Sequence, residues 1–367
     1  MIDEGFVWAI MLLPLGSFAV ISLVSLLGLM EIYSTTQNHP HFAGMHLRQL
    51  AWVGVGLLVL LVIARIDYHF WLDQAPWVYL ATLALLAAVL FVGTEKFGAR
   101  RWLEVGWLTF QVSELAKWSI IVVLAKLLGD LRSETLTLKD VAKVGALTGV
   151  PLALIAAQPD LGTALTLVPI AATGIFLAGL RWKHAAAFAL AALLLMPAGW
   201  FLLKPYQRAR LVTFANPGRD AQGPGYQTLQ SRIAVGSGGF WGKGMGEGSQ
   251  NQLGFIPVRH AEFIFAAYAE EQGFLGVLLA LGAYLILLLR LLHNVETAPD
   301  RAGALLVAGV TGLLIFHLLV NVGMVIGSVP VTGIPLPLMS YGGSATISTF
   351  MMLGLVMSVR MRRFVNL

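Results

Sequence analysis

The chain has 367 residues, of which 57% are hydrophobic and 12% charged, with a formal net charge of +5 and no cysteine. Without cysteine, disulfides, thiolate metal sites and cysteine nucleophiles are excluded, so any chemistry must use carboxylates, histidines and hydroxyls. The positive charge of so apolar a chain favours anionic lipid head groups, and no nucleic-acid motif is visible. Apolar runs of about membrane length predict a polytopic membrane protein with a single domain, residues 1–367.

Ten transmembrane helices are predicted from the apolar runs between polar breaks. They cover residues 7–31, 48–66, 75–93, 112–128, 143–157, 162–180, 185–203, 263–290, 302–327 and 338–359. The expected fold class is therefore an all-α integral membrane protein, a bundle of about ten transmembrane helices. Pro159 and Pro169 lie near the boundary between the fifth and sixth helices, where a re-entrant pair would preserve the same topology.

The topology follows from the even number of predicted helices, which places both termini on one side. The final cluster of Arg360, Arg362 and Arg363 assigns that side to the cytoplasm by the positive-inside rule. Residues 204–261, between the seventh and eighth helices, then form a large extracytoplasmic loop with eleven glycines. Snorkelling explains any single cation on the outer side, but cations beside a glycine-rich backbone together favour an anionic ligand such as phosphate.

Glu262 stands at the start of the eighth predicted helix, beside Arg259 and His260. A carboxylate there faces the positive end of the helix dipole and is partly desolvated. This position suits a catalytic or metal-linked group, and it equally suits a carboxylate that only complements the dipole. Glu270 and Glu271, about two turns further along, are expected to be structural.

Three further groups of polar residues interrupt the apolar pattern. Glu114 and Lys117 share a helix face, where they either hide each other's charge from lipid or, as we favour, hold Lys117 toward a polar cavity. Asp160 is expected to cap the sixth helix. Asn321 and residues 330–344 break the helical pattern at an outer membrane edge, where irregular backbone must be covered by protein or line a wet cavity.

Several long motifs in register resemble the SEDS family of shape, elongation, division and sporulation proteins, typified by RodA and FtsW. They are 98–102 (GARRW), 111–117 (QVSELAK), 158–163 (QPDLGT), 225–231 (GYQTLQS), 236–244 (GSGGFWGKG), 260–276 (HAEFIFAAYAEEQGFLG), 321–324 (NVGM) and 330–344 (PVTGIPLPLMSYGGS). The resemblance implies a peptidoglycan glycosyltransferase of the bacterial cytoplasmic (inner) membrane that polymerises lipid II at its outer face. It also implies a class B penicillin-binding protein as transpeptidase partner, with other cell-elongation proteins as further candidates. The short tails favour a RodA-like role in elongation over one in division.

For the site, the resemblance implies a carboxylate base, Glu262, that deprotonates the acceptor sugar hydroxyl. The diphosphate leaving group requires cations, for which the candidates are Arg100, Arg101, Lys117 and Arg210. The predicted substrate-binding set also includes Glu114, Ser231, Lys243, His260 and Ser340. A divalent cation, Mg²⁺ or Mn²⁺, is expected as a cofactor, with Glu262 or Asp160 as candidate ligands.

Two departures from the family pattern bear on the site. The family usually has His-Thr-Asp-Phe where residues 260–263 read His-Ala-Glu-Phe, so Glu262 carries one methylene more than the expected aspartate. A displacement of about 1 Å in a catalytic group can cost on the order of a hundredfold in rate. Val112 replaces the usual proline, which alters only the start of the fourth helix.

Two alternative functions remain open from the sequence. A lipid II flippase would need polar residues along a route through the membrane, whereas the polar motifs here collect at the outer edge. A non-catalytic scaffold for a transpeptidase is compatible with the Glu262 departure. Polymerisation is the favoured reading.

Overall fold

The computed structural model describes residues 4–37, 42, 44–96, 99–106, 108–131, 133, 135–219, 223–256 and 258–363, and this part of the chain is mostly helical. Gly98, the first residue of one motif, lies outside it. The long helices are α1 (Glu4–Thr36), α2 (Met45–Arg65), α4 (Ala75–Val92), α5 (Val112–Gly129), α6 (Leu138–Ala157), α9 (Trp182–Leu202), α13 (Ile264–Glu296), α14 (Arg301–Val325) and α15 (Gly343–Met361). The short ones are α3 (Tyr68–Asp73), α7 (Leu161–Leu165), α8 (Leu167–Leu177), α10 (Pro205–Ala215), the 3₁₀ helix η2 (Pro217–Arg219), α11 (Pro224–Ser237) and α12 (Ser249–Gln252).

Seven of the described helices are long and apolar enough to cross a membrane: α1 from Gly16 onward, α2, α4, α6, α13, α14 and α15. The sixth predicted range is divided into α7 and α8, which together are a shorter apolar segment. α5 carries Glu114, Lys117 and Lys126 along its 18 residues. The multi-pass character of the protein is therefore clear, while the number of ten spans stays a prediction.

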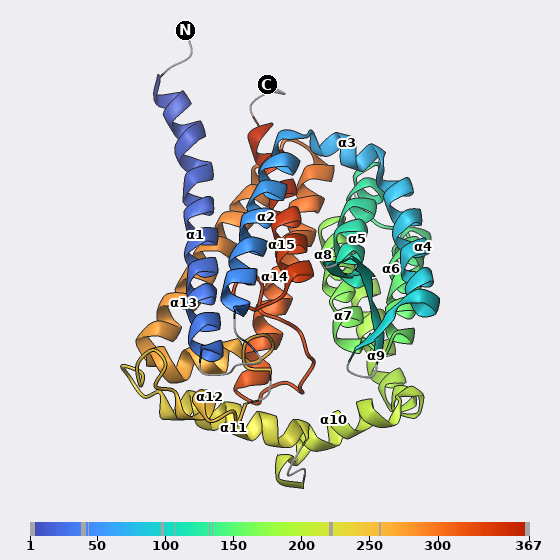
Figure 1. Cartoon of the computed structure of the whole chain (residues 1–367). Helices are drawn as coiled ribbons and strands as arrows, with labels where there is room; N and C mark the ends of the chain where they lie inside the picture. Colours follow the sequence, from blue (N-terminus) through green and yellow to red (C-terminus); the bar gives the residue numbers. More distant parts are fainter. Residues whose placement is uncertain are drawn as a thin grey trace.

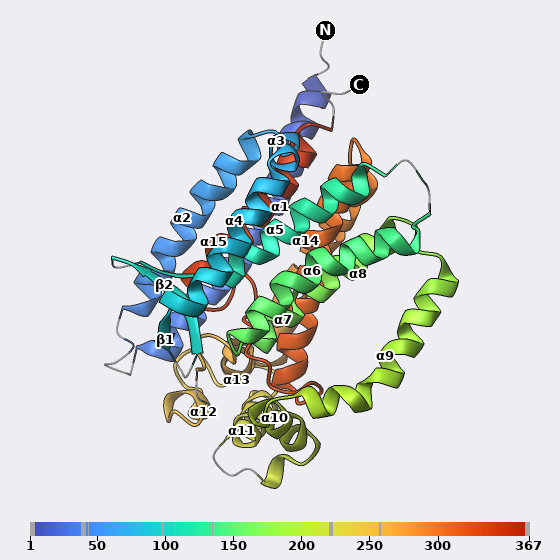
Figure 2. The same cartoon turned by 90° about the vertical axis from the view of Figure 1, so that its right-hand side faces the viewer.

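α14 and α15 form the centre of the bundle. In their apolar windows 67% and 72% of residues are buried, against 22% in α4 at the edge. α15 packs on α2, and α14 packs on α13, α5 and α8 (Figure 1). The beginning of α1 and the end of α15 lie at the same end of the bundle, and α10, α11 and α12 cross the opposite end (Figure 1). Figure 2 shows α9 at the edge, curving away from α6 and α8.

A small antiparallel sheet precedes α5 and corrects the all-α prediction. It has the order β1 (Thr94–Lys96), β2 (Ala99–Val105), β3 (Leu108–Gln111). Residues 108–111 alternate apolar and polar side chains, a period that suits a strand with two unlike faces. The last residue of β3, Gln111, pairs with Trp102 and is also the N-cap residue of α5. The sheet therefore fixes the position of the N-terminal end of α5, which carries Glu114 and Lys117.

Residues 204–261, predicted as a loop, fold in large part into α10, α11 and α12. α10 begins with Pro205 in its first turn, where a missing N–H costs nothing. The side chain of Gln207 accepts a hydrogen bond from the backbone N–H of Lys204 at 2.9 Å, which satisfies one donor at the helix start. The glycine-rich sequence is thus a set of short helices joined by turns.

α13 is interrupted at Gly273, whose φ of 63° and ψ of −162° lie outside the helical region. Glycine adopts this conformation without steric cost. The segment 238–244 lies against the break and satisfies backbone groups on both sides of it. The hydrogen bonds run from Lys243 N to Glu270 O, from Gly244 N to Glu271 O, from Phe274 N to Gly239 O and from Leu275 N to Phe240 O. Irregular backbone in this helix is therefore covered by protein.

Candidate active site

Glu262 lies in a run of turns immediately before α13 and is half-buried. Its backbone is held from two sides. The Asn321 amide nitrogen donates to the carbonyl of Glu262 at 2.9 Å and to that of Ile334 at 2.8 Å. The Ser340 hydroxyl donates to the carbonyl of Ala261 at 2.7 Å. Because Asn321 is fully buried in α14, the packing of α14 against residues 334–340 determines where the Glu262 carboxylate stands.

Charged residues from three other segments act on Glu262: Arg101 of β2, Arg210 of α10 and Asp160, which precedes α7. Burial raises the pKa of Glu262 above its usual value; Arg210 and Arg101 lower it by less, and Asp160 adds to the increase. Within the described residues no hydrogen bond reaches the Glu262 carboxylate. The site therefore holds a partly desolvated carboxylate, with raised proton affinity, beside two guanidinium groups.

Gly333 forms one wall beside this carboxylate. Its φ is 77°, and a Cβ at this position would lie 3.2 Å from Glu262 Oε1. The neighbouring carbonyl of Val331 accepts a hydrogen bond from Arg210 Nη1 at 3.1 Å. Residues 331–333 thus bring the Arg210 guanidinium and the Glu262 carboxylate to the same stretch of backbone.

Asp160 caps α7, as predicted: its carboxylate accepts from the backbone N–H of Thr163 at 3.2 Å. The other oxygen accepts from the Gln111 amide at 2.9 Å and lies 3.6 Å from Arg101 Nη1. Asp160 is buried and its oxygens have these partners. Asp160 therefore holds the Arg101 guanidinium near Glu262.

Among the described residues, no group of three or more His, Asp or Glu side chains could hold a metal ion by itself. Mg²⁺, however, is commonly held by one or two carboxylates together with substrate phosphates. Glu262, whose carboxylate has no hydrogen bond in the described part of the chain, fits that arrangement. Asp160 fits less well because its oxygens already have partners.

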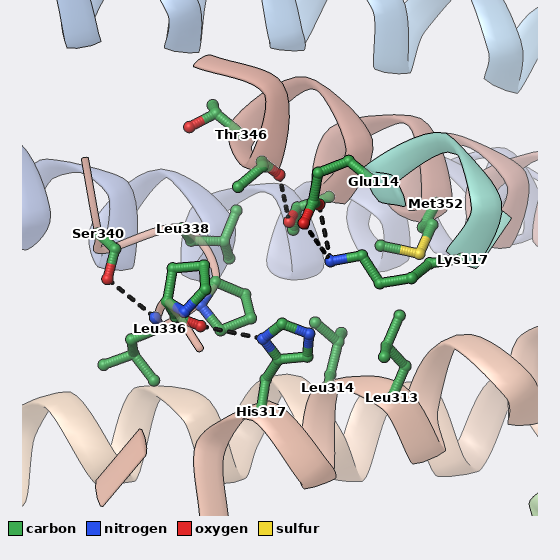
Figure 3. Close-up of a pocket in the computed structure, with 14 residues that line it drawn as sticks. Glu114, Lys117, Leu313, Leu314, His317, Leu336, Leu338, Ser340, Thr346 and Met352 are labelled. Carbon is green, nitrogen blue, oxygen red and sulfur yellow. Dashed lines mark hydrogen bonds and ion pairs between the residues drawn. The ribbon is translucent and has the colours of Figure 1, made fainter. Parts of the chain in front are cut away.

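Glu114 and Lys117 form a buried ion pair with Lys117 Nζ 2.7 Å from the carboxylate. They line a small cavity with His317, Ser340 and other residues. Its volume of about 10 Å³ has room for roughly one water molecule. Figure 3 shows the pair facing the His317 ring, whose Nδ1 lies 2.9 Å from the carbonyl oxygen of Pro335. Ser340 lines this cavity and also bonds to Ala261, so the ion pair and Glu262 share one supporting segment.

The structure separates the two neighbouring arginines of β2. Successive side chains of a strand point to opposite faces. Arg101 lies toward Asp160, whereas Arg100 is more than half exposed and its Nε lies 3.7 Å from Glu95. Only Arg101 of this pair acts on Glu262, so a joint role for both arginines gains no support from the geometry.

His260 lies among aromatic rings, 5.0 Å from Phe42 and 5.7 Å from Tyr341 between ring centroids. Burial and the nearby Arg259 lower the pKa of His260 to about 4, so the ring is neutral near pH 7. The backbone carbonyl of His260 accepts from Tyr341 N at 2.9 Å. In this structure His260 joins the segment around Tyr341 to the turn that carries Glu262.

Ser231 and Lys243 have partners away from Glu262. The Ser231 hydroxyl is buried and donates to the carbonyl of Val325 at 2.8 Å, which ties α11 to the end of α14. Lys243 Nζ donates to Glu270 at 2.6 Å and to Ser249 at 2.8 Å. The structure does not bring either side chain to the Glu262 cluster, and their roles with substrate stay predictions.

Glu270 and Glu271 are structural carboxylates in this arrangement, as expected. Both are buried. Glu270 accepts from Lys243, from Ser249 and from the backbone N–H groups of 250 and 251. Glu271 accepts from Ser34, from Gly246 N and from the Asn251 amide. Together they fasten the segment 243–251 to α13.

Sequence reasoning missed the side chain of Gln111 and the wall formed by Gly333. Gln111 is the first residue of the motif 111–117, and Gly333 lies within the motif 330–344. Their roles depend on partners 49 and 71 positions away, Asp160 and Glu262. A glycine between prolines was the available signal for a turn that approaches another group closely.

The sequence model of the family described as "Cell cycle protein", which covers FtsW, RodA and SpoVE, matches residues 7–364. The chain belongs to this family. The SEDS resemblance drawn from the motifs is thereby confirmed, and the matched region contains every residue of the candidate site.

Relatives and solved structures agree with this membership. The peptidoglycan glycosyltransferase MrdB of Escherichia coli is 39% identical over 322 residues, 87% of this chain and 86% of the relative. The peptidoglycan glycosyltransferase RodA of Treponema pallidum is 32% identical, over 92% and 95% of the two chains. A chain from a peptidoglycan synthase complex that coordinates polymerization and crosslinking superposes with a TM-score of 0.81 at 36% identity, covering 95% and 98%. The crystal structure of Thermus thermophilus RodA gives a TM-score of 0.71 at 31% identity, covering 95% and 97%.

Proposed function

We propose that this chain polymerises lipid II into glycan strands at the outer face of the cytoplasmic membrane, for cell elongation and shape. Peptidoglycan glycosyltransferase activity is the activity of the family members it matches along most of its length. The observation that carries the proposal is the Glu262 carboxylate, which has raised proton affinity and lies near Arg101 and Arg210. A carboxylate and two guanidinium groups suit a reaction that removes a hydroxyl proton and releases a diphosphate.

In the proposed reaction, Glu262 accepts the proton of the acceptor sugar hydroxyl. The hydroxyl oxygen forms a bond to the anomeric carbon of the donor, with inversion. The bond from that carbon to the diphosphate oxygen breaks, and polyprenyl diphosphate leaves with the electron pair. Arg101 and Arg210 stabilise the negative charge that develops on the leaving group because they stand beside Glu262 from two separate elements.

A divalent cation, when bound, would add charge stabilisation for the diphosphate. Glu262 is the residue that would hold it, together with phosphate oxygens of the substrate. Lys117 and Glu114 line the same cavity as Ser340, which bonds to the backbone of Ala261. They contribute to the reaction by helping to position the backbone that carries Glu262. Asn321 and Ser340 are positioning residues because they bond to the backbone at Glu262 and Ala261.

The orientation in the membrane follows from the charge of the chain ends. The beginning of α1 and the end of α15 lie together, opposite α10–α12 (Figure 1). Arg360, Arg362 and Arg363 at the end of α15 favour the cytoplasm for that side. The Glu262 site then faces outward. A class B penicillin-binding protein is the proposed partner, since a similar chain of known structure belongs to a complex for polymerization and crosslinking.

The proposal is tested with the purified protein, its transpeptidase partner, labelled lipid II and Mg²⁺ or Mn²⁺, by resolving glycan chains on a gel. We expect ladders from the wild type and none from Glu262→Ala. Glu262→Asp, which restores the carboxylate length of the family pattern, reports whether the extra methylene limits the rate. No polymer from the wild type, where a related enzyme makes it, would favour a scaffold. Transfer of the lipid II head group across proteoliposomes without polymer would favour a flippase.

A further inference from the structure

A second cavity lies away from the Glu262 site, between α1 and α13 and beside Met245, with a volume of about 270 Å³. Its apolar lining comes from Leu27 and Met30 of α1 and from Leu275 and Leu279 of α13. Met30 and Leu279 are each 51% exposed on the outer surface of the bundle, so the cavity opens toward lipid. A cavity of about 150 Å³ already holds a guest of the size of benzene, so this one has room for part of a hydrocarbon chain.

Glu31 is the acidic residue that lines this cavity. Its side chain belongs to a residue that is only 2% exposed, and its Oε1 has no hydrogen-bond partner. Ser34, less than one turn later on α1, donates to Glu271. A buried, unpaired carboxyl group within a membrane helix is costly, and such groups mark binding or transport sites by default. The reaction at Glu262 makes no use of it.

The surroundings of Glu31 are negative. The carboxylates of Glu270 and Glu271 act on it electrostatically. Two cations near this end of α1 already have partners: Lys243 is paired with Glu270 at 2.6 Å, and Arg259 donates to the carbonyl of Thr35 at 3.1 Å. A cationic guest is therefore favoured over a neutral or an anionic one, because the attraction between opposite charges is strong where water is excluded.

The arrangement of the lining also orients the guest. Glu31 lies five residues before the end of α1 at Thr36, about 7–8 Å along the helix axis. Leu27, Leu275 and Leu279 lie farther from the α10–α12 end of the bundle along their helices. Tyr268 lines the same cavity and donates its proton to the carbonyl of Gly276 at 3.1 Å, so its oxygen can still accept a hydrogen bond. The polar end of the cavity is thus nearer the surface, and its aliphatic end is nearer the membrane interior.

We propose that this cavity binds an aminophospholipid of the surrounding bilayer, whose primary ammonium group pairs with Glu31 and whose hydrocarbon chain lies along the leucines. A primary ammonium carries the required charge and donates three hydrogen bonds, for which Glu31 and Tyr268 are acceptors. A trimethylammonium head group has the same charge but no hydrogen to donate.

The test uses the full-length protein purified from nanodiscs of equal parts phosphatidylethanolamine, phosphatidylcholine and phosphatidylglycerol, with retained lipid identified by native mass spectrometry. Phosphatidylethanolamine is expected to exceed the other two by at least about tenfold, because loss of a charged hydrogen-bond partner costs more than that factor. Glu31→Gln should abolish the preference. Glu296→Gln, the same change at an exposed position near the far end of α13, should keep it.

A second variant and a simple amine separate binding from folding. Leu279→Trp fills the aliphatic part of the cavity and should remove the retained lipid while Glu31 stays in place. In detergent, dodecylamine should raise the melting temperature of the wild type and not of Glu31→Gln, and dodecanol should raise neither. Equal retention of the three lipids overturns the proposal, as does retention that survives Glu31→Gln. A co-purified membrane protein that crosslinks to Glu31 through a lysine would also overturn it, since another chain would then fill the cavity.

Discussion

Glu262 and the pair Glu270 and Glu271 lie in one stretch of seventeen residues, 260–276, yet their carboxylates are in opposite situations. Glu270 and Glu271 receive hydrogen bonds from hydroxyls, backbone N–H groups, an amide and Lys243. The Glu262 carboxylate receives none within the described residues. A carboxylate whose lone pairs are occupied fastens a structure, whereas one that is free and partly desolvated can take up a substrate proton.

The largest effect is expected from Glu262→Gln, which keeps the size of the side chain and removes its ability to accept a proton. The rate of lipid II polymerisation should fall by roughly 10²–10⁴-fold, the usual contribution of a general base. The melting temperature should not change, because within the described part of the chain the carboxylate has no hydrogen bond to lose. A rate equal to that of the wild type would assign proton removal to another group.

At Glu270 and Glu271, whose carboxylates are hydrogen-bonded, we expect a loss of stability rather than of rate. Lys243→Met leaves the charge of Glu270 buried without its cation, which should lower the free energy of unfolding by about 3 kcal/mol. Thermal unfolding in detergent measures the loss, and Lys243→Arg, which keeps the charge, is the control. The rate per folded molecule should change little. A large rise in KM for lipid II at unchanged stability would instead support the predicted role of Lys243 in substrate binding.

Asn321→Ala separates the position of Glu262 from its chemistry. The variant loses the hydrogen bonds to the carbonyls of Glu262 and Ile334, so the carboxylate is less well placed. We expect kcat to fall by about tenfold with a smaller change in KM, since displacements well below 1 Å already cost rate. Single-turnover polymerisation checks this. If kcat is unchanged, the Asn321 bonds serve folding alone.

The smallest expected effect is a shift in pH dependence, read after each rate profile is scaled to its own maximum. Glu262 is active as a carboxylate, so activity is present above its pKa and lost as the pH falls through it; burial places that pKa above the usual value of 4.5. Arg210→Met removes a cation that lowers this pKa, so the acidic limb of the rate profile should move to higher pH. His260, with a pKa of about 4, is already neutral over this range. A limb that stays in place would show that Glu262 does not control it.

Much of the helical bundle is predictable because each apolar run reports its own burial in lipid. The cap at Asp160 was also predictable, since the acceptor and its donor at Thr163 are only three residues apart. The sheet was not predictable, because its three strands are short, follow an apolar run directly, and are stabilised only by pairing with one another.

The candidate site shows the same division between local and distant information. Glu262 stands out in the sequence because it is a carboxylate at the start of an apolar helix. Its supports, Asn321 and Gly333, are 59 and 71 positions away and act through backbone packing that no local pattern describes. The separation of Arg100 from Arg101 likewise depends on the strand, because a helix or loop would not force the two onto opposite faces.

The break at Gly273 also has a consequence for the order in which the protein is made. The segment 238–251 leaves the ribosome before the groups at 270–275 to which its backbone and side chains bond. Until α13 is synthesised and inserted, the segment lacks these donors and acceptors and cannot reach its final form. The face of the protein that carries α10–α12 therefore cannot mature before α13 is made, and a chain that stalls before α13 cannot display it in its final form.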